Sequence, residues 1–260
     1  MILKDKIAIV SGGGTGIGLA ITEALVDAGA RVMICARNFD RLSLAAKEIN
    51  ERQGEERVLP IKVDVKKKEE VEKSVEEVIR KWGDLHILVN NSGRSGRIPL
   101  LSGDSAAWFD ILETNLNGMY FFCKAALRVM KDQAGGRIIN ISSILGKIGV
   151  PGYTAYCASK HGVIGFTSAL ALEVASRGIT VNAICPGWVD TPMAELGMSE
   201  TAKALGIPVE DFKKAAISRV PIHRFVSHEE VSGMAVFLAG DDGKAITGQA
   251  INIDGGVVMH

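Results

Sequence analysis

The sequence lacks the cysteine and histidine patterns that mark a redox or metal centre. Its four cysteines, Cys35, Cys123, Cys157 and Cys185, form no CxxC pair, and each lies among apolar or small residues. Such cysteines are expected to be reduced and mostly buried in a cytosolic protein. The five histidines show no HxH or HExxH spacing. We therefore predict no catalytic metal.

The chain also has no excess of charge and no long apolar run. Its 30 lysines and arginines equal its 30 aspartates and glutamates. This balance argues against nucleic acid or an anionic membrane as a partner. The apolar run Ile7–Val10 ends directly in Ser11 and Gly12, which does not fit a signal peptide. No segment approaches the length of a transmembrane helix. We expect a cytoplasmic protein with no membrane or nucleic-acid partner.

What the sequence does contain is a regular alternation of short apolar runs with amphipathic stretches. Most of these runs are rich in Val and Ile and do not alternate with polar residues, as in strands covered on both faces of a parallel sheet. The expected strands are Lys6–Val10, Arg31–Ala36, Arg57–Val63, Leu85–Asn90, Gly136–Ile141, Thr180–Ile184 and Ala250–Ile253.

This alternation predicts a doubly wound α/β sheet of the Rossmann type, with seven parallel strands and helices on both faces. No linker or repeat divides the 260 residues, so we expect one domain over residues 1–260. Residues 191–220 interrupt the alternation. We interpret them as a helical insertion, which at this edge of a sheet commonly covers a ligand.

A glycine-rich loop, SGGGTGIG at residues 11–18, follows the first expected strand and opens the first expected helix. A helix N-terminus attracts anions, and glycines let a pyrophosphate approach the backbone closely. A plain tight turn is the alternative, and the loop alone does not name the ligand.

Several motifs then occur together along the whole chain. Ser11, Gly12, Gly16 and Gly18 match the pattern T-G-x-x-x-G-x-G with Ser in place of Thr. The other motifs are NNSG at 90–93, Asn115, ISS at 141–143, YCASK at 156–160 and PGWVDT at 186–191. In this combination the sequence resembles the short-chain dehydrogenase/reductase family. The resemblance implies hydride transfer between a nicotinamide cofactor and a ketone or secondary alcohol.

The resemblance implies four catalytic residues, Ser143, Tyr156, Lys160 and Asn115. Tyr156 and Lys160 are four apart and share a helix face. A nearby ammonium lowers the pKa of a phenol from about 10, so Tyr156 is expected to act as general acid and base. Ser143 would hold the substrate oxygen. Its neighbour Ser142 points to the opposite side, and the family spacing favours Ser143. Asn115 would anchor a water that links Lys160 to solvent, or else cap or bend a helix.

We expect NADP(H) as the preferred cofactor, with NAD(H) possible. Ala36 stands where an acidic residue would bind a ribose 2′-OH, and Arg37 suits a 2′-phosphate. Against this, Thr15 is not basic, and Arg37 could stack on adenine or be solvated. The resemblance implies cofactor contacts from Ser11, Gly12, Gly14, Thr15, Gly16, Ile17, Gly18, Arg37, Asp64, Val65, Asn90, Gly93, Tyr156, Lys160, Pro186, Gly187, Val189 and Thr191.

The substrate pocket is expected to be predominantly apolar. Arg94 and Arg97 could receive an acidic group or simply face solvent. The other expected lining residues are Leu145, Ile148, Tyr153, Cys185, Trp188, Met193, Leu196 and Met198. Candidate substrates are small carbonyl or alcohol compounds: a 3-oxoacyl thioester, a cyclic ketone or alcohol, or a hydroxy acid. A non-catalytic nicotinamide-binding protein is the remote alternative. The resemblance also implies a homotetramer built through helices near 107–131 and 154–176.

Overall fold

The computed structural model describes residues 1–133 and 135–260, and within them seven parallel strands form one sheet. The strand order is β3-β2-β1-β4-β5-β6-β7. Successive strands are added on one side of β1 up to β3, and then on its other side from β4 onward. This confirms the predicted doubly wound α/β fold. The strands are β1 (Ile7–Ser11), β2 (Arg31–Ala36), β3 (Val58–Lys62), β4 (Ile87–Asn90), β5 (Gly136–Ile141), β6 (Ile179–Pro186) and β7 (Ala250–Ile253).

The predicted strand bounds hold for β2, β5 and β7 and differ by one to two residues elsewhere. β1 begins one residue later than expected and includes Ser11, because Ser11 is in register with Cys35 of β2 and Asn90 of β4. β6 continues through Pro186, which is in register with Ile253 of β7. In both strands, ladder pairing extends the strand toward the carboxyl edge of the sheet.

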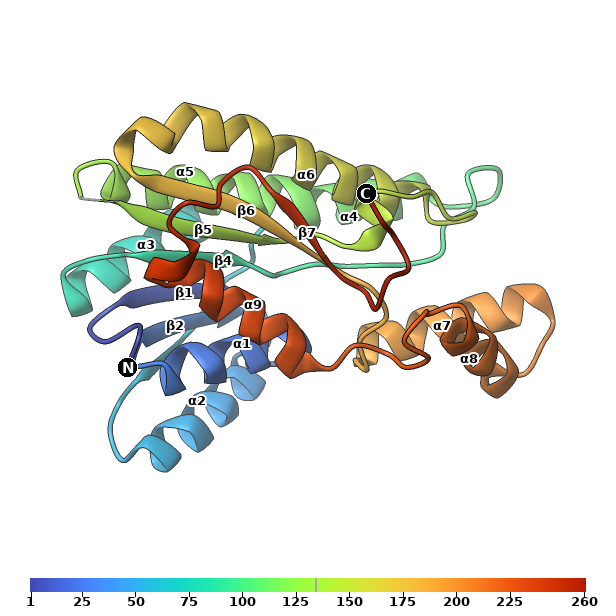
Figure 1. The fold of residues 1–260 in the computed structure, drawn as a ribbon, viewed down its shortest axis with the longest axis horizontal. Coiled ribbons are helices and arrows are strands. Elements are labelled where there is room, and N and C mark those ends of the chain that lie inside the picture. The colour runs from blue at the N-terminus through green and yellow to red at the C-terminus, as the bar shows by residue number, and fades with distance from the viewer. Residues whose placement is uncertain (134) are drawn as a thin grey trace.

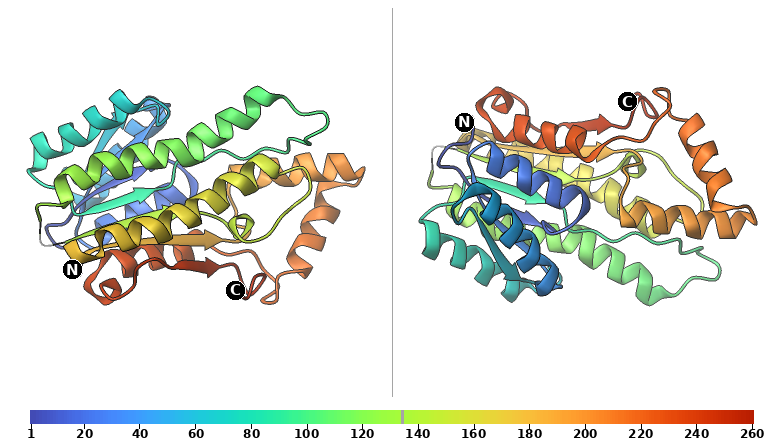
Figure 2. Two further views of the ribbon diagram at one scale, coloured as in Figure 1. Left: turned by 90° about the horizontal axis from the view of Figure 1, so that it is seen from above. Right: turned by 90° about the horizontal axis from the view of Figure 1, so that it is seen from below.

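Helices cover both faces of the sheet (Figures 1 and 2). One face carries α1 (Gly16–Asp27), α2 (Phe39–Gln53) and α9 (His228–Ala239). The other carries α3 (Lys68–Trp82), α4 (Ser105–Leu112), α5 (Gly118–Met130) and α6 (Thr154–Val174). Val10 and Ile34 belong to the first of two buried clusters, and Ile9 and Met33 to the second. Neighbouring strand residues thus face opposite cores, which is why the strands are apolar without alternation.

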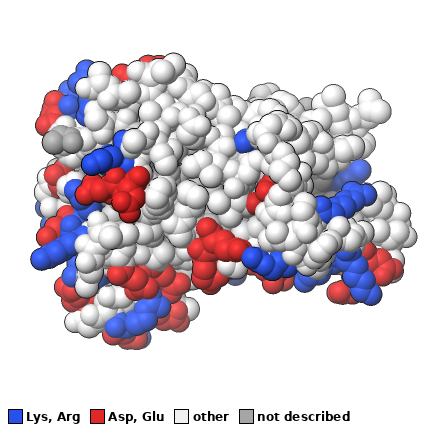
Figure 3. All heavy atoms as spheres, in the orientation of Figure 1, with Lys and Arg blue, Asp and Glu red and all other residues white. Residues whose placement is uncertain are grey.

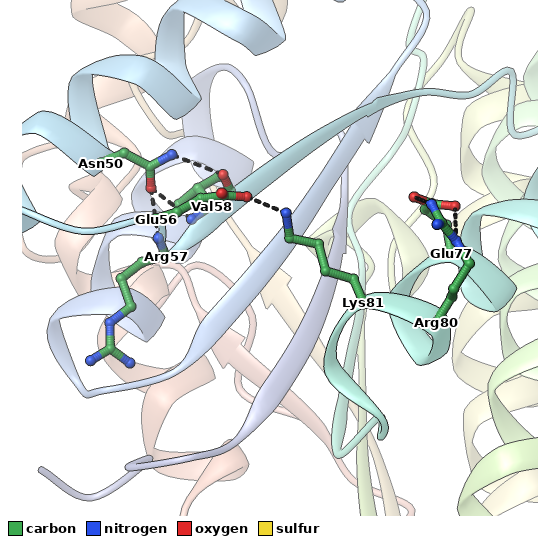
Figure 4. A network of polar contacts seen from close by, with 7 residues as sticks. All are labelled: Asn50, Glu56, Arg57, Val58, Glu77, Arg80 and Lys81. Atoms are coloured by element: carbon green, nitrogen blue, oxygen red, sulfur yellow. Dashed lines mark hydrogen bonds and ion pairs between the residues drawn. The ribbon is translucent and has the colours of Figure 1, made fainter.

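Local polar contacts fix the outer edge of the sheet (Figure 4). Asn50, near the end of α2, accepts hydrogen bonds at Oδ1 from the backbone N–H groups of Arg57 and Val58, at 2.8 Å each, and donates to the Val58 carbonyl. Lys81 of α3 reaches Glu56 in the same connection. These contacts set where β3 begins.

The predicted helical insertion forms two helices, α7 (Pro192–Leu205) and α8 (Val209–Ser218), which lie beyond the carboxyl edge of the sheet (Figures 1 and 2). Val189 before the insertion pairs with Val226 after it, and Val226 N–H donates to the Trp188 carbonyl at 2.9 Å. This bridge closes the base of the insertion at the carboxyl ends of the strands, the usual ligand position in such sheets.

The charged side chains of both signs are interspersed on the face drawn in Figure 3. Several form surface ion pairs, such as Arg224 with Glu230 and Lys67 with Glu70. Among the helices of residues 1–133 and 135–260, none is long and apolar enough to cross a membrane.

Candidate active site

A large cavity runs along the carboxyl edge of the sheet and has a volume of about 1520 Å³. Pockets for a single small ligand measure roughly 300–1,000 Å³, so this cavity can hold two ligands side by side. Most of the predicted site residues line it: Gly12, Thr15, Gly16, Ile17, Gly18, Arg37, Asp64, Val65, Gly93, Ser143, Tyr156, Lys160, Pro186, Gly187, Val189 and Thr191.

The glycine loop leaves its backbone bare at one end of this cavity. Gly12 and Gly16 adopt φ angles of 67° and 53°, a region that side chains disfavour. A Cβ on Gly18 would lie 2.1 Å from the Gly12 carbonyl oxygen. Glycine is therefore needed at Gly12 and Gly16 for the turn of the backbone. At Gly18 it is needed because the Gly12 carbonyl leaves no room for a side chain.

The N-terminus of α1 is built to receive an anion. Thr15 is its N-cap residue, and within the described chain no side-chain hydrogen bond caps this helix. By contrast, Asn38 caps α2 by accepting from Arg41 N–H at 3.1 Å. The first turn of α1, with its N–H groups not capped by a side chain, lines the cavity together with Gly12, so the residues present fit a dinucleotide pyrophosphate.

Ser11 and Gly14 were predicted to contact the cofactor, but they do not line the cavity. The Ser11 hydroxyl accepts hydrogen bonds from the backbone N–H groups of Asn91 and Ser92, at 3.1 and 3.0 Å. It ties the ends of β1 and β4 together beneath the loop. Gly14 faces α2, where a Cβ would meet Leu42 at 3.5 Å.

Asn90, which was predicted to lie near the ribose, is also absent from the residues that line the cavity. Its side chain is buried, and Nδ2 donates to Asn140 Oδ1 at 2.9 Å and to Cys123 Sγ at 3.3 Å. Asn140 in turn donates to Thr167 of α6 at 2.9 Å. These side chains join the middle of the sheet to the helix layer, so Asn90 holds the scaffold beneath the site.

The two serines after β5 point in different directions. Ser142 is buried and its hydroxyl donates to the Lys160 carbonyl oxygen at 3.0 Å. Ser143 lines the cavity, accepts from Leu145 N–H at 3.1 Å, and lies close enough to the Tyr156 hydroxyl for its own hydroxyl to act on the pKa of the phenol. The structure therefore places Ser143, rather than Ser142, beside the phenol.

Tyr156 and Lys160 share one face of α6 as predicted, but the charge does not act on the phenol as expected. Lys160 Nζ donates to the Ile141 carbonyl oxygen at 2.8 Å and lies over the Tyr156 ring, 5.6 Å from its centre. Burial raises the pKa of Tyr156 to about 12, and only the Ser143 hydroxyl opposes it. Burial lowers the pKa of Lys160 to about 8. Burial is therefore the largest influence on the pKa of both side chains.

Asn115 lies in a π-helical turn, Glu113–Asn117, between α4 and α5, behind the cavity wall. Its Nδ2 donates to the Arg94 carbonyl and to Ser159 Oγ, both at 2.9 Å, and its Oδ1 accepts from Arg94 N–H at 2.7 Å. Asn115 Oδ1 and Lys160 Nζ each lie 3.6 Å from the position of a Cβ on Gly93. The amide thus reaches the neighbourhood of the ammonium.

Sequence reasoning missed several cavity residues at the glycine-loop end. Lys62 ends β3 directly in register with Ala36 of β2, so it stands beside Arg37. Asn38 and Arg41, in the first turn of α2, line the same region. The register of parallel strands was the signal that could have pointed to Lys62.

Asp64, a predicted cofactor contact, also makes local hydrogen bonds after β3. It lines the cavity, and its carboxylate accepts from Lys66 N–H at 3.1 Å while its own N–H donates to Glu70. That hydrogen bond and the Lys67 ammonium hold the pKa of Glu70 below its usual value.

The other end of the cavity is the apolar one, between Tyr156 and the insertion. Of the predicted residues, Leu145, Ile148, Tyr153, Trp188 and Met193 line it. The expectation was wrong for Cys185, Leu196 and Met198, which do not line it; Cys185 and Met198 are buried in the core, and Leu196 is 55% exposed.

The two predicted arginines separate. Arg97 lines the cavity, whereas Arg94 does not and instead pairs with Asp110.

The four cysteines are free thiols, and three of them are buried. Among residues 1–133 and 135–260 no group of three or more His, Cys, Asp or Glu side chains is placed to share a metal ion.

The fold and this cavity define a nucleotide-dependent α/β enzyme scaffold, and comparison with known proteins identifies the family. A family model described as enoyl-(acyl carrier protein) reductase matches residues 12–258. The chain belongs to the short-chain dehydrogenase/reductase family.

Relatives match along nearly the whole chain. A 3-oxoacyl-[acyl-carrier-protein] reductase FabG from Haemophilus influenzae is 38% identical over 257 residues, covering 99% of this chain and 100% of the relative. The FabG of Vibrio harveyi is 39% identical over 259 residues, covering 100% of both. The crystal structure of a single-residue variant of actinorhodin polyketide ketoreductase with NADPH superposes with a TM-score of 0.93, at 40% identity over 97% of each chain.

Proposed function

We propose that this protein is an NADP(H)-dependent reductase of 3-oxoacyl thioesters, interconverting a ketone and a secondary alcohol. The observation that carries the proposal is the shared cavity: Ser143, Tyr156 and Lys160 meet at its apolar end, and the bare glycine loop lies at the other. Relatives named for 3-oxoacyl and polyketide ketone reduction support this substrate class.

The cofactor preference is argued from the charges around the end of β2. Arg37 and Lys62 are basic residues beside Ala36, and no acidic side chain occupies the Ala36 position. A 2′-phosphate would be attracted to this corner, whereas NAD(H) would lack the carboxylate that binds its free hydroxyl. The solved ketoreductase with NADPH supports the same choice. When bound, the cofactor supplies or takes the hydride.

The protein's own side chains would handle the substrate oxygen and its proton. Ser143, beside the Tyr156 hydroxyl, would orient the carbonyl oxygen. Tyr156, with its raised pKa, keeps its proton until the oxygen becomes basic and then donates it. Lys160 would bind the cofactor, and Asn115 would help to pass a proton to solvent.

Residues 1–260 would act as one catalytic unit, with the 191–220 insertion covering the substrate. We place this unit in the cytoplasm as a homotetramer. Large apolar side chains on the helices expected at the contacts support assembly: Phe109 is 60% exposed, Tyr120 41% and Leu172 84%. Sedimentation of the purified protein tests this assembly, and a mass other than that of four chains would contradict it.

A substrate panel tests the reaction directly. The purified protein would be offered a 3-oxoacyl pantetheine thioester, a cyclic ketone and a keto acid, each with NADPH and with NADH, and the absorbance of reduced nicotinamide followed. The highest kcat/KM is expected for the thioester with NADPH. Turnover of only the keto acid or cyclic ketone would reassign the substrate, and no turnover with either cofactor would contradict an enzymatic role.

A further inference from the structure

Helix α7 runs along the cavity from its cofactor end to its substrate end. Its N-cap residue Thr191 lies beside the glycine loop, with Cγ2 3.5 Å from the position of a Cβ on Gly16. About two and three turns further on, respectively, Gly197 and Thr201 line the cavity next to Tyr153. What holds the second half of α7 in place therefore determines the width of the substrate end.

The side chain of Tyr153 joins α7 to the catalytic helix. Its hydroxyl lies 2.9 Å from Thr201 Oγ1 and 3.2 Å from the Gly197 carbonyl oxygen. Tyr153 is also the N-cap residue of α6, and its carbonyl accepts from Cys157 N–H at 2.8 Å. Although Tyr153 is only three residues before Tyr156, it contacts the insertion and not Ser143.

Glu200 makes a second connection on the same stretch of α7. Its Oε2 accepts from the backbone N–H of Arg97 at 3.0 Å. The next N–H, that of Ile98, donates to the Gly152 carbonyl at 2.7 Å. The helix is thus tied to both loops that wall the substrate end, the one after β4 and the one before α6.

Apolar packing contributes little to holding this helix. Over its 14 residues, all within the described chain, only Met198 and Ala202 are buried. Met193, Leu196 and Leu205 are 42%, 55% and 61% exposed. An element with so few buried apolar contacts opens at low cost, so a few hydrogen bonds decide its position.

We infer that Tyr153 and Glu200 are positioning residues that fasten α7 over the substrate end of the cavity and so set the affinity for the carbonyl substrate. This inference rests on the proposed function. Neither the Tyr153 hydroxyl nor the Glu200 carboxylate bonds to Ser143, Tyr156 or Lys160. Their loss should therefore weaken substrate binding more than it slows the chemical step.

Three variants and one control test the inference with KM and kcat. Tyr153→Phe, Thr201→Val and Glu200→Ala should each raise the substrate KM by about threefold to tenfold, the range for one hydrogen bond. For all three, kcat and the cofactor dissociation constant should stay within about twofold. Because Tyr153→Phe already removes the contact with Thr201, the double variant should be no worse than Tyr153→Phe alone. Glu195→Ala removes an exposed carboxylate from the same helix and should behave as wild type.

Amide hydrogen exchange supplies a readout that does not depend on turnover. Tyr153→Phe and Glu200→Ala should speed exchange in residues 197–205, with α1 unchanged. If wild type turns over no carbonyl substrate, the proposed function fails, and local exchange still decides whether the fastening exists. An unchanged exchange pattern, a general loss of protection, or a fall in kcat at constant KM would each overturn the inference.

Discussion

The ammonium of Lys160 lies over the face of the Tyr156 ring, 5.6 Å from its centre. Its hydrogen bond goes to the backbone of Ile141. The protein thus keeps a neutral phenol next to a cation whose own charged form is disfavoured by burial. A neutral phenol is the form that can donate a proton to a carbonyl oxygen.

Replacing Tyr156 by Phe should remove that proton donor and leave the cavity intact. We expect turnover to fall by at least about 10²-fold to 10⁴-fold, the usual contribution of a general acid, while the cofactor still binds. Fluorescence titration with NADPH measures binding, and initial rates measure turnover. Near-normal rates would mean that another group protonates the substrate.

The pH dependence of stability should reveal the buried charge of Lys160. In the unfolded chain the ammonium titrates near 10.5, whereas burial lowers its pKa to about 8 in the folded protein. Between these values the unfolded state binds the extra proton, so stability rises with pH. Relative to Lys160→Met, wild type should gain on the order of 3 kcal/mol between pH 8 and 10.5.

Urea unfolding of both proteins at several pH values measures this difference, and comparison with the variant removes the titration of other groups. A constant difference from pH 7 to 10.5 would show that Lys160 is no harder to charge in the folded protein than in the unfolded one.

The two serines after β5 should separate activity from stability. Ser143→Ala removes the hydroxyl beside Tyr156 and should lower kcat/KM by about 10²-fold or more, with little change in unfolding free energy. Ser142→Ala removes a buried donor to the Lys160 carbonyl and should cost about 1–2 kcal/mol of stability. Rates and urea midpoints of both variants give the result; the reverse assignment would mean that the hydroxyls exchange roles.

The glycine loop offers a matched pair of substitutions. A Cβ on Gly14 would only touch Leu42 at 3.5 Å, so Gly14→Ala should fold normally and bind NADPH within about threefold of wild type. A Cβ on Gly18 would lie 2.1 Å from the Gly12 carbonyl oxygen, so Gly18→Ala should distort the loop and lose measurable binding. Thermal shifts with and without NADPH compare the two. Equal thermal shifts for the two variants would mean that the contact between residue 18 and the Gly12 carbonyl is not why glycine is needed at position 18.

Arg37 should discriminate between the two nicotinamide cofactors. Arg37→Gln should lower kcat/KM with NADPH by about tenfold to a hundredfold, the value of a charge-assisted hydrogen bond, and leave kcat/KM with NADH unchanged. Arg31→Gln, at the opposite end of β2, is the matched control for loss of one exposed charge. Equal losses of kcat/KM with both cofactors would mean that Arg37 contacts a group common to NADPH and NADH and not the 2′-phosphate.

The sequence was sufficient for the sheet, because strands buried on both faces carry a continuous Val and Ile signal that Ile9, Val10 and Ile34 exemplify. It was also sufficient to bring Tyr156 and Lys160 together, since a spacing of four fixes one helix face.

The direction in which a side chain points at a strand end could not be predicted from the sequence. Ser11 and Asn90 stand at strand ends next to the cavity, yet both turn toward protein, one to backbone N–H groups and the other to Asn140. The pKa of Tyr156 could not be predicted either, because desolvation depends on packing from distant segments. Lys62, by contrast, could have been found from the sequence, because it reaches the cavity through its parallel register with Ala36 at the end of the preceding strand.

The π-helical turn at Glu113–Asn117 makes α4, the turn and α5 a single continuous rod. One surplus residue in such a rod rotates everything after it by about 100°. The two halves can therefore address different neighbours, α4 packing on α6 and α5 on α3. Shortening the rod by one position would swing Phe122 away from the sheet, so the surplus residue that directs Asn115 toward the neighbourhood of Lys160 also keeps α5 packed on the sheet.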